Sequence, residues 1–419
     1  MKYIINGGHR LEGKITISGN KNSVFPCVAA ALLTEEEVIL ENISDLKDTK
    51  ILIQILKKMG VKVDKQGAIL KINAANIRHH TLPESLVTKL RGSVVLVGSI
   101  LARLNKVRFP HPGGDIIGRR SIETHLDGFK ALGAKVKRSN LSYLMSIDNQ
   151  QKKDVEIFFK EASVTATENL ILASVLGSKT VVLRNCAKEP HVFDLCKMLS
   201  QMGAKIAGIG SDTLIISGVD KLFGTKFRIG TDFIEVGTYM IAAAITGGRV
   251  EISGVDSTDL SPFLVPLKEF GIQVEDGDNQ LVAWADKLKS PAKITTNIWP
   301  GFPTDLMSVA MVLATQSKGV ILCHDWMYES RMFFVDKLIS MGANITLADP
   351  HRVLIYGPTK LKGRLLDTPD IRAGMALVLA SLVAKGRSVI NQSELIERGY
   401  EDVVGKLKKL GAEIEREGQ

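Results

Sequence analysis

Apolar and polar residues alternate along this chain in a pattern that occurs six times. Each occurrence is an amphipathic stretch that ends in Leu, Met or Phe, followed by Gly and, three positions later, by a β-branched residue. Gly at such a point ends a helix in the left-handed conformation, and the β-branched residue begins a strand. The phrases are KKMGVKV at Gly60, KALGAKV at Gly133, SQMGAKI at Gly203, KEFGIQV at Gly271, ISMGANI at Gly342 and KKLGAEI at Gly411, at intervals of 73, 70, 68, 71 and 69 residues. The pattern predicts six helix–turn–strand repeats.

Most repeats continue into a second short strand, but the sixth has only eight residues after Gly411. The missing strand has a candidate at the other end of the chain. Residues 3–15 (YIINGGHRLEGKI) match residues 214–227 and 353–366, with Gly, Leu and Gly at corresponding places. We therefore expect the N-terminus to complete the sixth repeat.

Three repeats in each body predict two domains. The first spans residues 22–229 and carries a Gly-rich lid loop at 111–121, and the second combines residues 1–21 with 230–419. Each repeat also holds a helix rich in small and apolar residues, such as GMALVLASLVA at 374–384. A helix that is apolar on every side must be buried. The fold class is therefore α/β, with apolar helices inside each domain.

Composition narrows the class of ligand. The chain has 419 residues, 45% hydrophobic and 24% charged, and a net charge of +9. This basic balance favours anionic partners. Aromatic residues make up only 5%, too few for base-stacking platforms, so we expect small anionic ligands rather than nucleic acid.

The cellular setting is also predicted from composition. The four cysteines show no metal-binding or disulfide spacing, so buried free thiols are expected. The N-terminus lacks an apolar signal core, and no apolar run reaches the roughly 18 residues of a membrane span. We expect a cytoplasmic protein without membrane contact.

The candidate chemistry lies where strands lead into the buried helices. SGNKNS (18–23), TDFIEVG (231–237), FPTDLMS (302–308) and TPDIRAG (368–374) each place a charged residue there. Asp232, Asp305 and Asp370 could simply cap their helices. The positive charges of Lys21 and Arg372 at helix N-termini are unfavourable with the helix dipole. Either solvation or a bound anion would compensate for them. The stretch HPGGDIIGRRSIETH (111–125) has the composition of a lid.

Other motifs are absent or incomplete. Residues 8–14 (GHRLEGK) fit most of a phosphate-binding P-loop, but Ile15 stands where Ser or Thr is required. Dinucleotide-binding, zinc-protease and serine-hydrolase motifs do not occur.

The six repeats, together with SGNKNS, PGGDIIGRR, SVTATEN, FPTDL, ESRM, PDIRAG and ERGYED, resemble the enolpyruvyl transferase family over essentially the whole chain. The resemblance implies two inverse α/β barrels, each of three βαβαββ units, with the active site in the cleft between them. It implies transfer of the enolpyruvyl group of phosphoenolpyruvate to the 3′-hydroxyl of UDP-N-acetylglucosamine, the first committed step of peptidoglycan synthesis. No cofactor and no metal are expected, and the enzyme is expected to be a monomer.

The resemblance also implies roles for individual residues. Lys21 would hold the phosphate of phosphoenolpyruvate, and Asn22 would contact the sugar. Asp305 would act as the base for the sugar hydroxyl, and Asp115 would be the acid of the lid. A cationic cage around phosphoenolpyruvate would comprise Arg120, Arg331, Arg372 and Arg398. The uridine diphosphate site would be lined by Glu123, His125, Lys160, Ser163 and Val164. Arg91 and Asp370 would be supporting residues of the active site.

Several positions depart from the family pattern. Asp115 stands where many relatives have the Cys that fosfomycin alkylates, which predicts resistance to this epoxide. Ser121, Glu123, Thr165 and Phe233 replace a usual Pro, Asp, Gly and Arg. Thr165 puts the closest backbone approach to the diphosphate in doubt, because Gly is used where a ligand must come near.

Two alternatives remain at this point. Shikimate phosphate could be the acceptor, although the lid and the uridine-side residues resemble those of the nucleotide-sugar branch. The chain could also be a non-catalytic scaffold that binds a nucleotide or RNA through its basic face.

Overall fold

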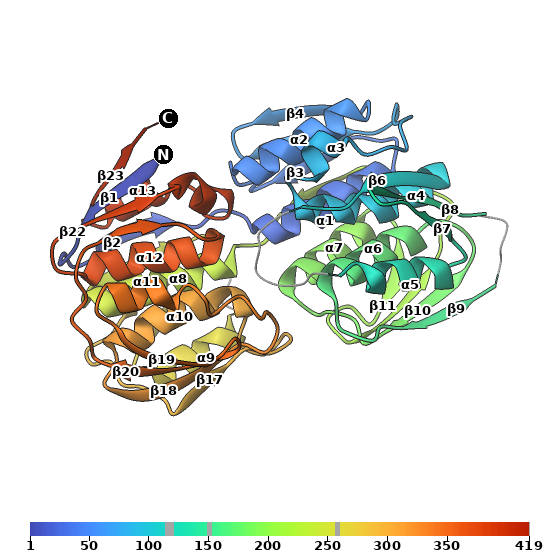
Figure 1. Cartoon of the computed structure of the whole chain (residues 1–419). Coiled ribbons are helices and arrows are strands. Elements are labelled where there is room, and N and C mark those ends of the chain that lie inside the picture. Colours follow the sequence, from blue (N-terminus) through green and yellow to red (C-terminus); the bar gives the residue numbers. More distant parts are fainter. Residues whose placement is uncertain (114–120, 149–152, 256–259, 419) are drawn as a thin grey trace. The chain divides into compact units, whose positions relative to one another are not determined.

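The computed structural model describes residues 1–113, 121–148, 153–255 and 260–418. The chain divides into two compact units (Figure 1). The first unit comprises the described residues between Gly19 and Gly230. The second comprises Met1–Ser18 and the described residues from Thr231 onward.

The first unit contains three sheets among the described residues. Their strands, in spatial order, are β13 (Thr225–Arg228), β3 (Val38–Glu41), β5 (Ile69–Asn73) and β4 (Lys62–Gln66); β6 (Lys106–Pro110), β8 (Ser142–Ser146) and β7 (Lys135–Arg138); and β11 (Lys205–Ala207), β12 (Thr213–Ser217), β10 (Thr180–Arg184) and β9 (Val155–Phe158). The α-helices are α1 (Lys21–Ala30), α2 (Lys47–Lys58), α3 (Glu84–Val87), α4 (Leu96–Leu104), α5 (Glu123–Ala131), α6 (Val164–Ser174) and α7 (Pro190–Gln201). Two short 3₁₀ helices are η1 (Ala31–Leu33) and η2 (Arg91–Val95).

The second unit repeats this plan. Its sheets, in spatial order, are β21 (Leu365–Asp367), β22 (Arg387–Asn391), β1 (Lys2–Asn6) and β23 (Glu413–Glu417); β15 (Gln273–Gly277), β16 (Gln280–Trp284), β14 (Arg249–Ser253) and β2 (Glu12–Thr16); and β17 (Lys293–Thr295), β18 (Gly319–His324), β20 (Arg352–Gly357) and β19 (Asn344–Asp349). The helices are α8 (Phe233–Thr246), α9 (Ser261–Glu269), α10 (Thr304–Gln316), α11 (Val335–Ser340), α12 (Ile371–Val383), α13 (Val403–Lys409) and the 3₁₀ helix η4 (Ser393–Arg398). The predicted α/β class with six repeats is confirmed.

The repeat glycines adopt the conformation that the sequence predicted. All six have a positive φ, between 88° and 104°. In each case the glycine follows the end of a helix and leads into an antiparallel strand. Side chains with a Cβ rarely adopt this left-handed conformation, so Gly is needed at the turn.

The N-terminal strand completes the sixth repeat, as predicted. Strand β1 lies between β22 and β23 and pairs antiparallel with both. Ile4, for example, pairs with Val389 on one side and with Glu415 on the other. The two ends of the chain are thus hydrogen-bonded into one sheet.

The apolar helices form the centre of each unit. In the second unit α8, α10 and α12 pack against one another (Figure 1). Every residue of α10 from Leu306 to Thr315 is buried. In the first unit α1, α4 and α6 pack together in the same way. Among the helices of the described residues, none combines the length and the apolar character needed to cross a membrane.

The cysteines behave as expected. Cys27, Cys186, Cys196 and Cys323 are all free and buried. Burial raises the pKa of the Cys186 and Cys196 thiols to about 12. These thiols are packing residues and poor nucleophiles.

A buried ion pair joins two helices of the second unit. Lys406 of α13 donates to Glu235 of α8 at 2.5 Å, and both side chains are almost fully buried. Ser18, at the end of the N-terminal segment, contacts Glu401, and Lys406 Nζ lies 3.5 Å from its hydroxyl. Burial raises the pKa of Glu235 to about 7, although Lys406 lowers it. The pair therefore ties the N-terminal segment, α8 and α13 together.

Removing Lys406 should destabilise this unit in a pH-dependent way. Glu235 has an ordinary pKa of 4.5 and a pKa of about 7 in the folded protein. Between these two pH values the folded state binds a proton at Glu235 that the unfolded state has lost, so the free energy of unfolding falls as the pH rises from about 4.5 to about 7. Without Lys406 the ionised form has no partner. We expect Lys406→Met to lower the free energy of unfolding by about 3 kcal/mol at pH 8 and by less at pH 5.5. Urea denaturation followed by circular dichroism measures both values.

The matched control is the double variant Glu235→Gln/Lys406→Met, which removes both charges. It should regain most of the stability at pH 8, because no unpaired charge is left in the core. An equal loss for Lys406→Met at both pH values would contradict this account.

Candidate active site

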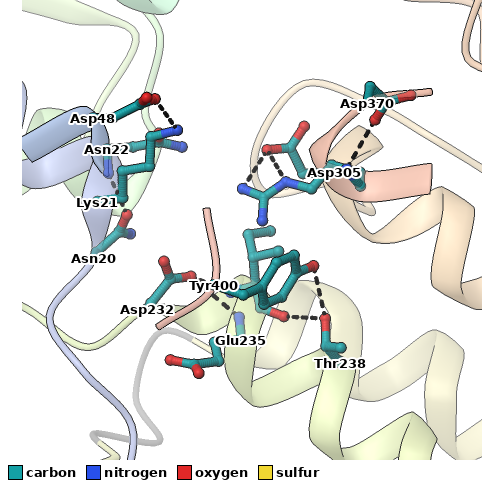
Figure 2. Close-up of polar contacts among 12 residues, drawn as sticks. Asn20, Lys21, Asn22, Asp48, Asp232, Glu235, Thr238, Asp305, Asp370 and Tyr400 are labelled. Carbon is teal, nitrogen blue, oxygen red and sulfur yellow. Dashed lines mark hydrogen bonds and ion pairs between the residues drawn. The ribbon is translucent and has the colours of Figure 1, made fainter. Parts of the chain in front are cut away.

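Lys21 begins α1 and is paired with a carboxylate. Its Nζ lies 2.7 Å from Asp48 Oδ2 in α2, and only 12% and 3% of the two side chains are exposed. Asn20 caps the helix by accepting a hydrogen bond from the Asn22 amide at 2.8 Å (Figure 2). A cation at a helix N-terminus opposes the dipole, and Asp48 supplies the compensating charge. Lys21 is therefore not a solvated surface lysine.

A second group in the first unit surrounds His125 near the start of α5. The ring Nε2 lies 2.9 Å from Thr165 Oγ1, one residue inside α6. Burial, with a smaller contribution from Arg91, lowers the pKa of His125 to about 3. The ring is therefore neutral at neutral pH. Thr165, a departure from the family pattern, holds His125 in place.

The remaining uridine-side residues lie on the same two helices or close to them. Ser163 is the N-cap residue of α6 and Val164 its first residue. The Ser163 amide donates to the Glu161 carbonyl at 2.8 Å. Glu123 begins α5 and pairs with Arg138 at 2.5 Å, while Lys160 Nζ lies 3.4 Å from Asp127. Arg91 Nη2 donates to the Ser121 carbonyl at 3.4 Å. The structure thus gathers these expected residues around the N-termini of α5 and α6.

In the second unit, two arginines hold Asp305. Arg331 Nη2 lies 3.0 Å from Oδ1. Arg372 contacts Oδ2 through Nη2 at 2.8 Å and Nε at 3.0 Å, and Figure 2 draws these two contacts beside Asp305. The arginine side chains are 1% and 9% exposed, whereas that of Asp305 is 29% exposed. Two members of the predicted cationic cage are therefore assembled around the predicted base.

Both guanidinium groups are held in the charged state and are incompletely partnered. Burial alone lowers the pKa of Arg331 and of Arg372, but neighbouring groups, first Asp305, outweigh it and raise both. Arg331 Nε and Arg372 Nη1 are buried and have no hydrogen-bond partner within the described residues. A buried N–H without a partner is costly, so these atoms mark a place where an anion would be stabilised.

The three aspartates at the helix starts have different functions. Asp232 and Asp370 cap α8 and α12, each accepting two backbone N–H groups. Asp305 does not cap α10, because the N-cap position belongs to Pro303 and Asp305 is the second residue of the helix. Its side chain binds the arginines instead. The alternative of simple capping therefore holds for Asp232 and Asp370 and fails for Asp305.

Some predicted residues stay without a described contact. Asp115, Arg120 and most of the lid loop lie outside the described residues. Arg398 is the last residue of η4, in the same unit as Asp305. Their predicted roles remain predictions. Within the part of the chain that the structure describes, no group of three His, Cys, Asp or Glu side chains could hold a metal ion.

Sequence reasoning missed Asp48 and Tyr400 as residues that hold site side chains, and it missed the contact of Thr165 with His125. Asp48 pairs with Lys21, Thr165 bonds to His125, and Tyr400 places its ring 5.1 Å from the Arg372 guanidinium carbon. Asp48 lies far from Lys21 in the sequence and follows an unremarkable polar stretch. Tyr400 belongs to the motif ERGYED, which indicated that this segment belongs to the family pattern but did not indicate that Tyr400 contacts Arg372.

Comparison with known proteins identifies the class. Residues 5–407 match the family model of EPSP synthase (3-phosphoshikimate 1-carboxyvinyltransferase). The chain therefore belongs to the enolpyruvyl transferase family and is an enzyme that transfers a group. Its structure is similar to that of the enolpyruvyl transferase NikO from Streptomyces tendae, with a TM-score of 0.89, 25% identity, and 99% and 98% of the two chains covered. An EPSP synthase from Acinetobacter baumannii shares the fold at a TM-score of 0.77 and 18% identity over 99% of each chain.

Sequence relatives are more specific. The chain is 47% identical over 422 residues to a protein of Borreliella burgdorferi, covering 99% of this chain and 98% of that protein. It is 45% identical over 424 residues to one of Treponema denticola, covering 99% of both. It is 44% identical over 425 residues to one of Bradyrhizobium diazoefficiens, covering 99% and 98%. All three are named UDP-N-acetylglucosamine 1-carboxyvinyltransferase.

The contact between Tyr400 and Arg372 yields a prediction. Thr238 donates its single hydroxyl proton to the Ile234 carbonyl at 2.7 Å, so at 3.1 Å the Tyr400 hydroxyl donates to Thr238. This bond fixes the ring beside the guanidinium group, where a cation–π contact is favourable. Tyr400→Leu removes the ring, and we expect the KM for phosphoenolpyruvate to rise about tenfold. Initial rates of phosphate release at varied phosphoenolpyruvate concentration give this KM.

The control is Tyr400→Phe, which keeps the ring and loses only the hydroxyl. Its KM should stay within about threefold of the wild-type value, since the cation–π contact remains. If Tyr400→Phe and Tyr400→Leu raised KM equally, the ring would not be what positions Arg372.

Proposed function

We propose that this protein transfers the enolpyruvyl group of phosphoenolpyruvate to the 3′-hydroxyl of UDP-N-acetylglucosamine and releases phosphate, as the first committed step of peptidoglycan synthesis. The observation that supports the chemistry is the group of Asp305, Arg331 and Arg372, a carboxylate held between two buried cations. The named relatives, at 44–47% identity over nearly the full chain, support the acceptor. The enzyme acts as a cytoplasmic monomer on small-molecule substrates.

Each group of residues has a task in this reaction. Lys21 and the arginines bind the phosphate and carboxylate of phosphoenolpyruvate, because planar guanidinium groups match both anions. Asp305 accepts the proton of the sugar 3′-hydroxyl while the oxygen of that hydroxyl bonds to C2 of phosphoenolpyruvate. Asp115 donates a proton to C3 and completes the addition. In the elimination a C3 proton returns to the Asp115 carboxylate, the C2–C3 double bond re-forms, and the C2–O bond to phosphate breaks so that phosphate leaves. No metal or organic cofactor takes part.

The groups near the starts of α5 and α6 support the binding of the acceptor, UDP-N-acetylglucosamine, at this place. The N-terminus of α6, which begins at Val164, would direct its first backbone N–H groups to a diphosphate. Neutral His125 adds a ring without adding charge. Arg91, Glu123 and Lys160 surround these groups, and their exposed polar side chains supply contacts to the uridine and the sugar.

Phosphate release is the decisive measurement. The protein should release phosphate from phosphoenolpyruvate with UDP-N-acetylglucosamine and not with shikimate phosphate. Asp305→Asn should keep the fold and lose about 10² to 10⁴ in turnover, the usual contribution of a general base. Release with shikimate phosphate alone would assign the other acceptor of the family, and release with neither would remove the proposal.

Asp115 predicts the response to fosfomycin. A carboxylate is a much poorer nucleophile towards an epoxide than a thiolate, so the wild-type protein should form no adduct and keep its activity. Asp115→Cys should become inactivated over time, with the adduct on residue 115, and intact-mass spectrometry detects it.

Asp115→Asn is the control for the catalytic role, since it cannot donate a proton to C3 and should lose most turnover. A fosfomycin adduct on the wild-type protein, or full activity of Asp115→Asn, would remove the role given to Asp115.

A further inference from the structure

Asp305 contacts the two guanidinium groups that the proposed function assigns to substrate anions. Both carboxylate oxygens are engaged, Oδ1 by Arg331 and Oδ2 by Arg372, at 2.8 to 3.0 Å. Bonds from cations stabilise the ionised carboxylate and oppose its protonation. A carboxylate held in this way is therefore poorly suited to accept the proton of a hydroxyl group.

We propose that Asp305 acts as an internal anion that occupies the Arg331–Arg372 site, and that the anion of the substrate replaces it there and so releases it to act as the base. The inference rests on the proposed function for the identity of the substrate anion. The competition itself requires only that the same two guanidinium groups bind an anion.

Exposure indicates which partner can move. The side chains of Arg331 and Arg372 are 1% and 9% exposed, and Arg372 is further held by the ring of Tyr400. The side chain of Asp305 is 29% exposed and lies in the first turn of α10. A change of its side-chain rotamer would turn the carboxylate towards solvent without moving the helix. The cations are fixed and the acid is mobile.

The guanidinium groups also have capacity for a larger anion. Each can donate five hydrogen bonds in a planar fork. Arg331 Nε and Arg372 Nη1 have no hydrogen-bond partner in the described part of the chain, which leaves donors that one carboxylate does not satisfy. A phosphate or a substrate carboxylate that bonds to these atoms as well would outcompete Asp305.

The neighbouring acids have other bonds. Asp370 accepts the Arg372 and Ala373 amides at the start of α12. Asp325 accepts the Thr304 hydroxyl and the amides of Met327 and Tyr328. Both act on Arg331 only through their charge. Asp370 therefore provides a matched control, since Asp370→Asn removes a nearby negative charge while Asn still serves as an N-cap.

The test is calorimetric titration of the full-length protein with inorganic phosphate, alone and with saturating UDP-N-acetylglucosamine, and with phosphoenolpyruvate in the absence of UDP-N-acetylglucosamine. Asp305→Asn should bind the anion about tenfold more tightly than wild type, because the competing charge is gone. It should do so while losing turnover. Asp370→Asn should stay within about threefold of wild type. Weaker or unchanged binding by Asp305→Asn, or equal tightening in Asp370→Asn, would overturn the proposal.

Thermal unfolding keeps the test valid if Asp305→Asn is unstable. An anion that binds the folded state raises the melting temperature, and at a given concentration the rise is larger for tighter binding. Phosphate should therefore raise the melting temperature of Asp305→Asn by more than that of wild type, and an equal or smaller rise would count against displacement. These binding results do not depend on the acceptor. If no acceptor supported phosphate release and Asp305→Asn still bound phosphate more tightly, the proposed function would fail and the displacement would stand.

Discussion

Burial of helices that are apolar on every side is the constraint on which the rest of the structure depends. The three inner helices of each unit can carry no polar side chain along most of their length without burying it. Buried hydroxyl and amide groups along these helices form hydrogen bonds, as Thr238, Asn169 and Ser381 do, and charged groups lie mainly near the helix starts. Lys21, Asp305 and Arg372 all occupy the first or second position of an inner helix, and that is where the candidate active-site groups are found.

Pairing of charges follows from the same constraint. A cation placed at the start of a buried helix is taken out of water, and it needs a carboxylate close by. Lys21 has Asp48, and Arg331 and Arg372 share Asp305. Lys21 and Asp48 lie on α1 and α2, and Arg372 and Asp305 on α12 and α10, whereas Arg331 lies in a turn before α11. The first two pairs therefore join helices as well as neutralising charge.

Exposure separates a structural pair from a functional one. Glu235 and Lys406 are both almost fully buried. Asp305 is more exposed than its arginines, so an anion from solution can compete with it. A carboxylate–cation pair thus stabilises the fold at Glu235 and Lys406, whereas at Asp305 the pairs with Arg331 and Arg372 can be exchanged for a bound anion.

The sequence by itself determined the repeats, the fold class, the closing strand and most of the candidate residues, because these depend on local periodicity and on motifs. The six glycines follow from a short-range pattern that each repeat displays. The return of β1 to β22 and β23 follows from the match between residues 3–15 and the corresponding segments of other repeats. Only the tertiary structure decided which charges meet. The contacts of Lys21 with Asp48, of His125 with Thr165 and of Tyr400 with Arg372 join residues of separate helices or turns. Side-chain direction and burial at such contacts are set by how the helices pack, and no local pattern in the chain encodes them.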